Sequence, residues 1–355
     1  MINVVVDPRA RLAYAWFYIC GLREVFGPSN VHFSVHEFSG LSPESCYSFD
    51  QYFAFTIERD NTISRFVIDY RDLPGVDSAA YDWSDVYGSV NLTETIAGGV
   101  PKTRAIGPGF GVGPSRLSRL DLRLPATSLL AHAHDRRRLG ASLVPGNQRL
   151  LREQLFWQRM PSISDFSPKV SDPHYIFYAA TLWEHNNCIA STNPLRADFM
   201  RAVKANATVR FEGGFRVHGD HPQRIEFEDL LLEHSFHIQD WIEKTSRSAL
   251  VFNNAAVHGC LGWKLAQFLC MGKAIISTEI SNVLPRPLIH GVHVHFVDDS
   301  SEVAGAIRKI TTDDAYRRNL EEGARSYWDD LLAPGNAIRR LTDATFNTDE
   351  LSRAD

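Results

Sequence analysis

The feature that most constrains the fold of this chain is a repeated alternation of short apolar segments with longer amphipathic ones. Apolar runs such as NVVVD (3–7) and YFAFTIER (52–59) indicate buried strands, and the stretch Ala10–Phe26 between them has helical periodicity. A second series of the same kind begins at YIFYAATLW (175–183). Such alternation is typical of α/β domains with a mostly parallel sheet. We therefore expect two of these domains.

The boundary between the two series is the stretch MPSISDFSPKVSDPH (Met160–His174), which is rich in Pro and Ser. A length of 355 residues also suits two domains. The expected division is an N-terminal domain at 1–165, a C-terminal domain at 166–335, and a last helix at 336–355 that crosses back to the first domain. The predicted fold class is α/β, with two Rossmann-like doubly wound domains that face each other across a cleft and bind ligands at strand carboxyl ends.

Composition and charge argue against several classes of protein. Apolar residues form 44% of the chain and charged residues 22%, as in globular proteins, and no apolar run has the length of a membrane span. The five cysteines include no C-x-x-C pair, which argues against a disulfide framework or a zinc knuckle. The first residues lack the pattern of a secretory signal. We expect a cytoplasmic protein that binds no nucleic acid, because its net charge is −5.

Positive charge is concentrated between residues 102 and 160, where eleven lysines and arginines stand against three acidic residues. This region includes HDRRRLG (134–140). One interpretation is a solvated loop or helix face. The other is a patch for anionic lipid or for a phosphate-bearing acceptor, which predicts peripheral association with the inner face of the membrane.

The most informative stretch is HGCLGWKLAQFLCMGKAIIS (His258–Ser277), which predicts a helix and then a buried strand. The helix starts at Leu261 or Gly262, so Lys264 lies in its first turn and Gln267 lies on the same face. A helix N-terminus offers free N–H donors and a partial positive charge, which disfavours a lysine unless an anion binds nearby. A diphosphate is an anion that fits this helix end.

The polar residues around this helix have either ligand-binding or purely structural roles. In the first case, Lys264 neutralises the diphosphate and Gln267 pairs with ribose hydroxyls. In the second, Lys264 extends along the surface and Gln267 is solvated. The stretch STEISN (277–282) ends the predicted strand, where small polar residues commonly line a ligand crevice, although it could also cap a helix.

The segment Val251–Val297 resembles the nucleotide-sugar-binding half of GT-B glycosyltransferases, especially the bacterial retaining class called glycosyl transferases group 1. In that family a loop, helix and strand of the form E-G-x-G-x-x-x-x-E-A-x-A-x-G-x-P-V-V hold the donor. The run GKAII (272–276) and the helix AYRRNLEEGARSYW (315–328) match the family's order. VRFEGGF (209–215) stands where the family has V-x-F-x-G. The resemblance covers residues 174–346, whereas the first half matches only in general organisation.

The family's pair of glutamates is missing from this chain. The resemblance aligns the ribose-binding glutamate with Gln267, and the glutamate that approaches the donor sugar with Gly259, beside His258. Thr181 stands near the position of the family's basic pair for the diphosphate, and Lys264 is the substitute candidate. The donor-binding candidates are Lys264, Gln267, Gly259, Gly262, Trp263, Ser281, Asn282, Thr181 and Arg196.

The first domain offers candidates for binding the acceptor. DVYGSVNL (85–92) brings Asp85, Tyr87 and Asn91 to a strand end, although such residues often only pair locally. His258 and Asp85 are the candidates for a catalytic group, and the residue that carries the chemistry is otherwise unknown.

The glycine-rich stretch GPGFGVGP (107–114) lies late in the first domain. It lacks the following apolar helix of a dinucleotide site, so Gly109 and Gly111 are expected to allow close backbone approach at the acceptor side. The histidines of HGVHVHF (290–296) have no carboxylate or cysteine at suitable spacing, so no metal site is expected.

These observations predict a metal-independent, hexosyltransferase-like glycosyltransferase with no cofactor. It would move a sugar from a nucleoside diphosphate to a glycan, lipid-linked or other acceptor, as in surface polysaccharide synthesis. A retaining reaction needs no protein base, whereas an inverting one needs an Asp or His of the first domain. The alternatives are a catalytically weakened GT-B binding subunit and a nucleotide-sugar epimerase, which needs titratable residues.

Overall fold

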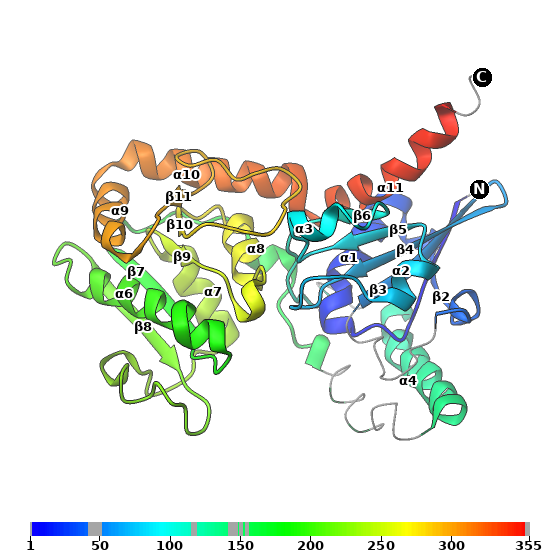
Figure 1. Ribbon diagram of the computed structural model, residues 1–355, viewed down its shortest axis with the longest axis horizontal. Helices are drawn as coiled ribbons and strands as arrows, with labels where there is room; N and C mark the ends of the chain where they lie inside the picture. Colours follow the sequence, from blue (N-terminus) through cyan, green and yellow to red (C-terminus); the bar gives the residue numbers. More distant parts are fainter. Residues whose placement is uncertain are drawn as a thin grey trace. The chain divides into compact units, whose positions relative to one another are not determined.

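The computed structural model describes residues 2–41, 52–114, 119–140, 148, 152 and 156–351. The chain divides into two compact units, one made of Met1–Ile163 with Leu331–Asp355 and the other of Ser164–Asp330 (Figure 1). The division after Ile163 falls within the Pro- and Ser-rich stretch noted above. Both units combine β-strands with α-helices, which confirms the predicted α/β class.

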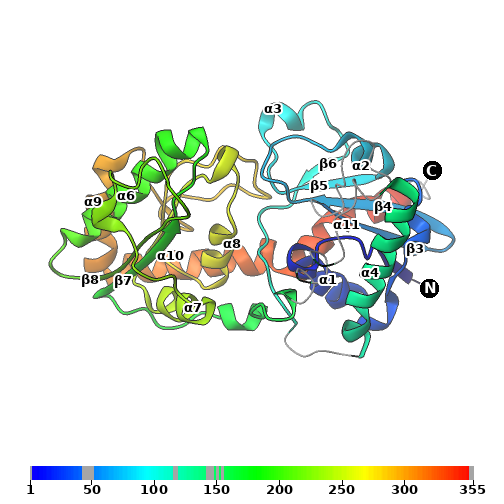
Figure 2. The same ribbon diagram turned by 90° about the horizontal axis from the view of Figure 1, so that it is seen from below.

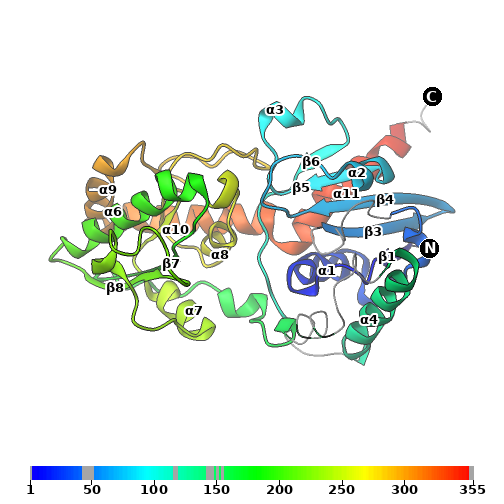
Figure 3. The ribbon, with the colours of Figure 1, turned by 60° about the horizontal axis from the view of Figure 1, so that its bottom comes forward.

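The described part of the first unit contains a six-stranded sheet in the order β2-β1-β3-β4-β5-β6 (Figure 3). Its strands are β1 (Ile2–Val6), β2 (Val31–Phe33), β3 (Tyr52–Arg59), β4 (Thr62–Asp69), β5 (Val86–Ser89) and β6 (Thr103–Ala105). Strand β3 runs antiparallel to β1 and β4, whereas the other neighbours are parallel. Asp60 and Asn61 have φ values of 51° and 65°, the left-handed conformation of a two-residue hairpin that joins β3 to β4. The sheet is therefore mixed rather than mostly parallel.

The helices described in the first unit are α1 (Leu12–Phe26), α2 (Ser78–Trp83), α3 (Glu94–Ala97), α4 (Arg119–Leu139) and α11 (Pro334–Leu351). Helix α11 packs along α1 (Figure 2). A Cβ atom on Gly21 would lie 2.3 Å from the carbonyl oxygen of Pro334, so the glycine allows this close approach. Arg339 forms an ion pair with Glu24, 315 residues earlier in the chain. The last helix is thus part of the first unit.

All strand pairs described in the second unit are parallel. Its strands are β7 (Tyr175–Thr181), β8 (Arg210–Arg216), β9 (Val251–Asn253), β10 (Ile275–Ser277) and β11 (His295–Phe296). Strands β9 to β11 form one sheet and β7 pairs with β8. The N–H of Ala249 donates to the carbonyl of Tyr175 (2.7 Å), which keeps β7 beside β9. The carboxyl ends of β7, β9 and β10 therefore lie at the same edge.

Helices cover the strands of the second unit and bury its core. They are α6 (Asn193–Lys204), α7 (Ile238–Arg247), α8 (Trp263–Cys270), α9 (Ser300–Thr312) and α10 (Asp314–Tyr327). Helix α6 packs against α9, and α8 packs against α10. No helix in the described ranges combines the length and the apolar character needed to cross a membrane.

Helix α8 has the local structure that its sequence predicts. Gly262 is its N-cap, and Gly272 follows its end in the left-handed conformation with φ 58°. The apolar side chains of Leu265, Phe268 and Leu269 are buried. The apolar periodicity of this stretch therefore predicted the helix and its buried face.

Candidate functional site

A small pocket lies at the carboxyl ends of β9 and β10 in the second unit. Parallel strands commonly place ligand-binding residues at this edge, because the loops after the strands meet there. The pocket is lined by Asn253, Asn254, Ala255, Gly259, Cys260, Leu261, Gly262, Glu279, Ile280, Ser281 and Asn282. Four of the predicted donor-binding residues therefore line one cavity: Gly259, Gly262, Ser281 and Asn282.

Side chains from the segment after β7 hold the pocket loop in place. The amide of Asn187 donates to the carbonyl of Ala256 (2.9 Å), and the hydroxyl of Thr192 donates to the carbonyl of Ala255 (2.9 Å). The amide of Asn254 donates back to the carbonyl of Thr192 (3.0 Å). The loop is thus fixed by three hydrogen bonds, one to Asn187, which precedes the π-helical turn Cys188–Thr192, and two to Thr192, which ends it.

The loop has its least common backbone geometry at His258 and Gly259. Their φ values are 57° and 76°, in the left-handed region that a non-glycine residue rarely adopts. A Cβ atom on Gly259 would meet no atom within 4 Å, so the glycine faces open space. Its carbonyl accepts a hydrogen bond from the amide of Asn282 (2.8 Å). Such a conformation at a pocket is a reason to suspect a functional role.

The exposed ring of His258 lies next to that of His185, with centroids 4.7 Å apart. The N–H of His258 donates to the side-chain oxygen of Asn187 (3.2 Å), which joins the two loops. The sequence analysis selected His258 but missed His185. The available signal was the position of His185, two residues after Trp183 in the segment that follows a buried strand.

Lys264 makes a contact that its sequence position did not predict. Its ammonium group donates to the carbonyl of Ala179 in β7 (2.5 Å) and lies 4.9 Å from the ring centroid of Tyr178. Burial lowers the pKa of Lys264 well below its usual value, and the charge of Arg196 lowers it further. Lys264 is not among the residues that line the pocket, and it lies over the end of β7 instead.

Arg196 contacts a residue of the pocket but does not line the pocket itself. This buried side chain donates from Nε to Oδ1 of Asn254 (2.9 Å), and Asn254 is a pocket residue. Its Nη1 atom donates to the carbonyl of Thr181 (3.3 Å), so Thr181 contacts Arg196 through its backbone and does not line the pocket. Arg196 is not a surface arginine, because it is only 6% exposed.

Lys264 and Arg196 form a pair of cations without an anion. Within the described ranges, their hydrogen-bond partners are backbone carbonyls, a neutral amide and the hydroxyl of Tyr178, and neither side chain forms an ion pair. Buried charges in proteins are usually paired or bound to a ligand. The pair therefore gives this part of the second unit a positive electrostatic potential, which favours anions.

The N-terminus of α8 adds further hydrogen-bond donors. The N-cap residue is Gly262, which has no side chain to accept a hydrogen bond from the first N–H groups of the helix. Gln267 is 8% exposed and, in the part of the chain that the structure describes, its side-chain amide makes no hydrogen bond. Neither Trp263 nor Gln267 lines the pocket.

Glu279 places a carboxylate at the pocket, which the sequence analysis missed. It is exposed in the loop after β10, within the STEISN stretch from which only Ser281 and Asn282 were selected. The amide of Asn253 donates to the hydroxyl of Ser277 (2.9 Å) at the same edge. The pocket thus has a carboxylate and amide groups at its rim, and these groups can bind hydroxyl groups. The cation Arg196 contacts the pocket residue Asn254.

The structure separates the three acceptor-side candidates around β5. Asp85 precedes β5 and accepts a hydrogen bond from the N–H of Arg65 (2.7 Å), so it lies at the amino end of the strand and pairs locally. Asn91 follows β5, and its amide donates to the carbonyl of Arg71 (2.6 Å). The grouping of Asp85 with Tyr87 and Asn91 at one strand end was therefore wrong, because β5 lies between Asp85 and Asn91.

Tyr87 and Asn91 hold an arginine that the sequence analysis missed. The hydroxyl of Tyr87 donates to Oδ2 of Asp69 (2.5 Å), and this buried carboxylate also binds Arg71. Burial, followed by the charge of Asp69, raises the pKa of Tyr87. The available signal was the Asp-x-Arg sequence at the end of the apolar strand that contains Asp69.

The glycine-rich stretch 107–114 packs closely against α1. A Cβ atom on Gly109 would lie 3.0 Å from Cδ1 of Phe17 and 3.2 Å from the hydroxyl of Tyr18. Gly111 is buried in the same stretch. The lack of a side chain at Gly109 therefore serves close packing on the helix.

The basic region between residues 102 and 160 is only partly described. Lys102 donates to the carbonyls of Tyr81 (2.6 Å) and Ser84 (2.8 Å), so its charge is engaged locally. Arg116 and Arg149 lie outside the described residues. In the stretch HGVHVHF (290–296), the rings of His290 and His295 contact each other, with centroids 4.7 Å apart. Within the described ranges, no group of three His, Cys, Asp or Glu residues could hold a metal ion.

The sequence matches no protein-family model and no curated protein sequence. Among solved structures, the chain is similar to TarM, with a TM-score of 0.36 and 11% identity over 52% of this chain and 36% of that one. It is also similar to HepE from Anabaena in complex with UDP, with a TM-score of 0.43 and 10% identity over 76% of this chain and 66% of that one.

A third similar structure is WaaG, a glycosyltransferase involved in lipopolysaccharide biosynthesis, with a TM-score of 0.34 and 12% identity over 78% of this chain and 77% of that one. The chain thus spans about a third of the length of TarM and about two thirds of the length of HepE.

Proposed function

We propose that the chain is a glycosyltransferase that takes a sugar from a nucleoside diphosphate and transfers it to an acceptor. The observation that carries this proposal is the pair Lys264 and Arg196, two cations beside the pocket whose partners in the described ranges are all neutral. A diphosphate supplies the missing negative charge. It is also the leaving group whose charge such an enzyme must stabilise.

The energetic argument starts from the lowered pKa of Lys264. Burial and the like charge of Arg196 both disfavour its ammonium form, so the ligand-free site is electrostatically strained. A bound diphosphate relieves this strain, because an opposite charge at close range favours the charged form of a lysine. To reach the diphosphate, the ammonium group exchanges the carbonyl of Ala179 for phosphate oxygens.

The remaining polar groups suit the sugar part of the donor. Glu279, Asn282 and the backbone of Gly259 lie at the rim, where they can bind sugar hydroxyls. The paired rings of His258 and His185 stand next to this rim and are the candidates for contact with the reacting sugar. Gln267 retains its proposed role with the ribose, since its amide forms no hydrogen bond in the described ranges.

A binding subunit that holds a nucleotide without turnover is the second candidate. The observation that favours it is that Gln267 and Gly259 stand at the two positions where the family that the chain resembles has its glutamate pair. An incubation of the protein with nucleotide sugars and glycan acceptors separates the two functions. Acceptor-dependent release of nucleoside diphosphate supports the transferase, whereas binding without release supports the subunit.

The site itself is tested by calorimetric titration with UDP, GDP and a panel of nucleotide sugars. Lys264→Met is expected to weaken binding by about tenfold or more, because a charge-assisted hydrogen bond is lost. The same variant should unfold at an equal or higher temperature, since burial disfavours the ammonium group. Lys309→Met, on the exposed face of α9, is the matched control. Equal affinity of the wild type and Lys264→Met would contradict the proposed site.

A further inference from the structure

The first unit contains the same polar module twice. Asp7 and Arg9 follow β1, and Asp69 and Arg71 stand at the end of β4, in each case as Asp-x-Arg. In both copies the arginine N–H lies 2.9 Å from Oδ1 of the aspartate. The distance from Nε to Oδ1 is 2.9 Å in the first copy and 3.0 Å in the second. The distance from Nη2 to Oδ2 is 2.7 Å in the first copy and 2.6 Å in the second. The two guanidinium groups are therefore held in the same way.

The two modules lie at the same edge of the sheet. Strands β1 and β4 both pair with β3 and both run antiparallel to it, so they point in the same direction. Their carboxyl ends are consequently on one side, with the first residue of β3, Tyr52, between them. Burial raises the pKa of Tyr52, and the charges of Asp77, Asp7, Arg9 and Arg71 also act on it, which agrees with this position.

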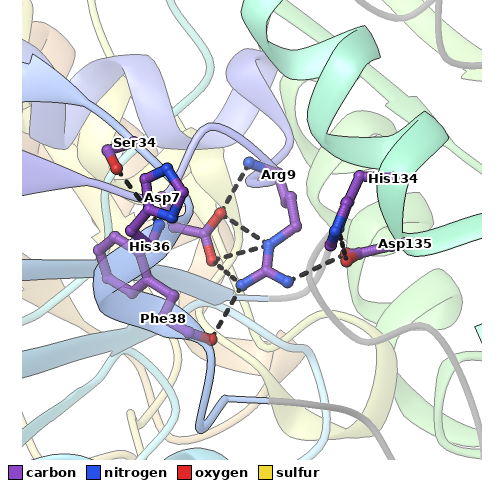
Figure 4. A network of polar contacts seen from close by, with 7 residues as sticks. All are labelled: Asp7, Arg9, Ser34, His36, Phe38, His134 and Asp135. Atoms are coloured by element: carbon purple, nitrogen blue, oxygen red, sulfur yellow. Dashed lines mark hydrogen bonds and ion pairs between the residues drawn. The ribbon is translucent and has the colours of Figure 1, made fainter. Parts of the chain in front are cut away.

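The copy at β1 is closed by a third residue. Arg9 donates from Nη1 to Oδ2 of Asp135 in α4 (3.0 Å), and from Nη2 to the carbonyl of Phe38 (3.4 Å). Figure 4 shows the guanidinium between the carboxylates of Asp7 and Asp135. Arg9 is 3% exposed, so this copy is part of the core. One carboxylate holds the guanidinium, and a second one occupies its remaining edge.

The copy at β4 is open. Asp69 holds Arg71 through its N–H, Nε and Nη2 groups, but in the described ranges Nη1 makes no hydrogen bond. The side chain of Arg71 is 19% exposed, whereas that of Asp69 is 3% exposed. Tyr87 fixes the carboxylate and Asn91 fixes the backbone of Arg71. The result is a rigid guanidinium with one edge available to a ligand.

We propose that Arg71 binds a carboxylate on the acceptor, in the place that Asp135 takes on Arg9. This inference rests on the proposed transferase function and assigns the acceptor to the class of carboxylated sugars. The closed copy supplies the geometry, because it shows what completes this module within the same protein. A guanidinium whose orientation is already fixed loses little freedom on binding.

The closed copy favours a carboxylate over a phosphate at this position, because a planar carboxylate, that of Asp135, pairs with Nη1 of Arg9. Burial lowers the pKa of Arg71, but the hydrogen bond and the charge of Asp69 raise it, and the charge of Asp77, the N-cap of α2, adds to this effect. The charge of Asp77 therefore also acts on an anion that binds Arg71. The open module therefore suits a ligand group like the side chain of Asp135.

The test uses the full chain and saturation-transfer NMR titrations with glucuronate, glucose and glucose 6-phosphate. The wild type is expected to bind glucuronate about tenfold more tightly than the other two sugars. Arg71→Gln is expected to remove this preference. Arg59→Gln, the same change at an exposed arginine of β3, is the matched control and should keep it. Glucuronate binding that is unchanged in Arg71→Gln overturns the inference, and tighter binding of glucose 6-phosphate overturns the choice of a carboxylate.

A second variant leaves the Asp-x-Arg module intact. Asp77→Asn keeps the helix cap on the N–H of Ala80, because asparagine is an equally good N-cap, and it removes one negative charge near Arg71. Glucuronate should then bind more tightly, and unchanged or weaker binding contradicts the inference. Titration of the same variants with UDP isolates the donor site. If the wild type does not bind UDP, the proposed transferase function is refuted. The preference for glucuronate is measured separately, so it tests the role of Arg71 even in that case.

Discussion

The ammonium group of Lys273 donates a hydrogen bond of 2.6 Å to the hydroxyl of Ser171, 102 residues earlier, although the lysine side chain is fully buried. It also donates to the carbonyl of Ser246 (2.8 Å). Burial is the largest influence on this group and lowers the pKa of Lys273 to about 8, while Glu321 partly opposes the shift. The residue lies directly after α8 and ties its end to the segment before β7.

This lowered pKa predicts the pH dependence of stability. The pKa of an unfolded lysine is near 10.5, so between pH 8 and 10.5 the unfolded state binds more protons than the folded state. The free energy of unfolding should therefore increase as the pH rises from about 8 to about 10.5. Urea unfolding at a series of pH values measures this slope. Lys273→Met should flatten it and Lys309→Met should not, and equal slopes in both variants would refute the assignment.

The close contact between α1 and α11 predicts a large effect at Gly21. Gly21→Ala places a Cβ atom 2.3 Å from the carbonyl of Pro334, which should destabilise the first unit by about 1–3 kcal/mol through overpacking. Thermal unfolding followed by circular dichroism measures the change. Gly305→Ala in α9 is the control, because its Cβ atom meets nothing within 4 Å and alanine favours the helix. Unchanged stability in Gly21→Ala would show that α11 does not pack as described.

Lys264 and Arg196 have no anionic partner in the described ranges, so a carboxylate introduced beside Arg196 should compete with the diphosphate of the sugar donor. Asn254→Asp places a negative charge on the atom that accepts from Arg196. We expect UDP to bind about tenfold or more weakly, because the new anion takes the role of the diphosphate. Calorimetric titration measures this change. Asn206→Asp adds the same charge in a distant loop, where Oδ1 already accepts hydrogen bonds from Thr208, and should leave the affinity unchanged.

The left-handed backbone at His258 allows its backbone strain and its role in catalysis to be tested separately. His258→Gly should raise the free energy of unfolding by about 1 kcal/mol, because glycine adopts a φ of 57° without steric conflict. If the imidazole contacts the reacting sugar, kcat falls in the same variant although the protein is more stable. Asp60→Gly, at the hairpin between β3 and β4, should give the stability gain alone. An unchanged kcat in His258→Gly would limit His258 to shaping the loop.

The sequence alone determined the local structure around the candidate site. The apolar periodicity of residues 258–277 placed α8 and β10, because side chains three and four apart share a helix face whatever lies around them. Glycine at position 272 ended the helix for an equally local reason, the left-handed conformation it adopts. The position of the pocket at strand carboxyl ends followed from the α/β pattern in the same way.

Only the tertiary structure decided which polar groups meet. Lys264 reaches Ala179 across 85 residues and Arg196 reaches Asn254 across 58, and no periodic pattern encodes such distant pairs. The two Asp-x-Arg modules are alike in sequence, yet one is closed by Asp135, 126 residues away from Arg9, and the other is open. Local conformation depends on neighbours in the chain, whereas the partner of a charged group depends on which distant segments the packing brings together.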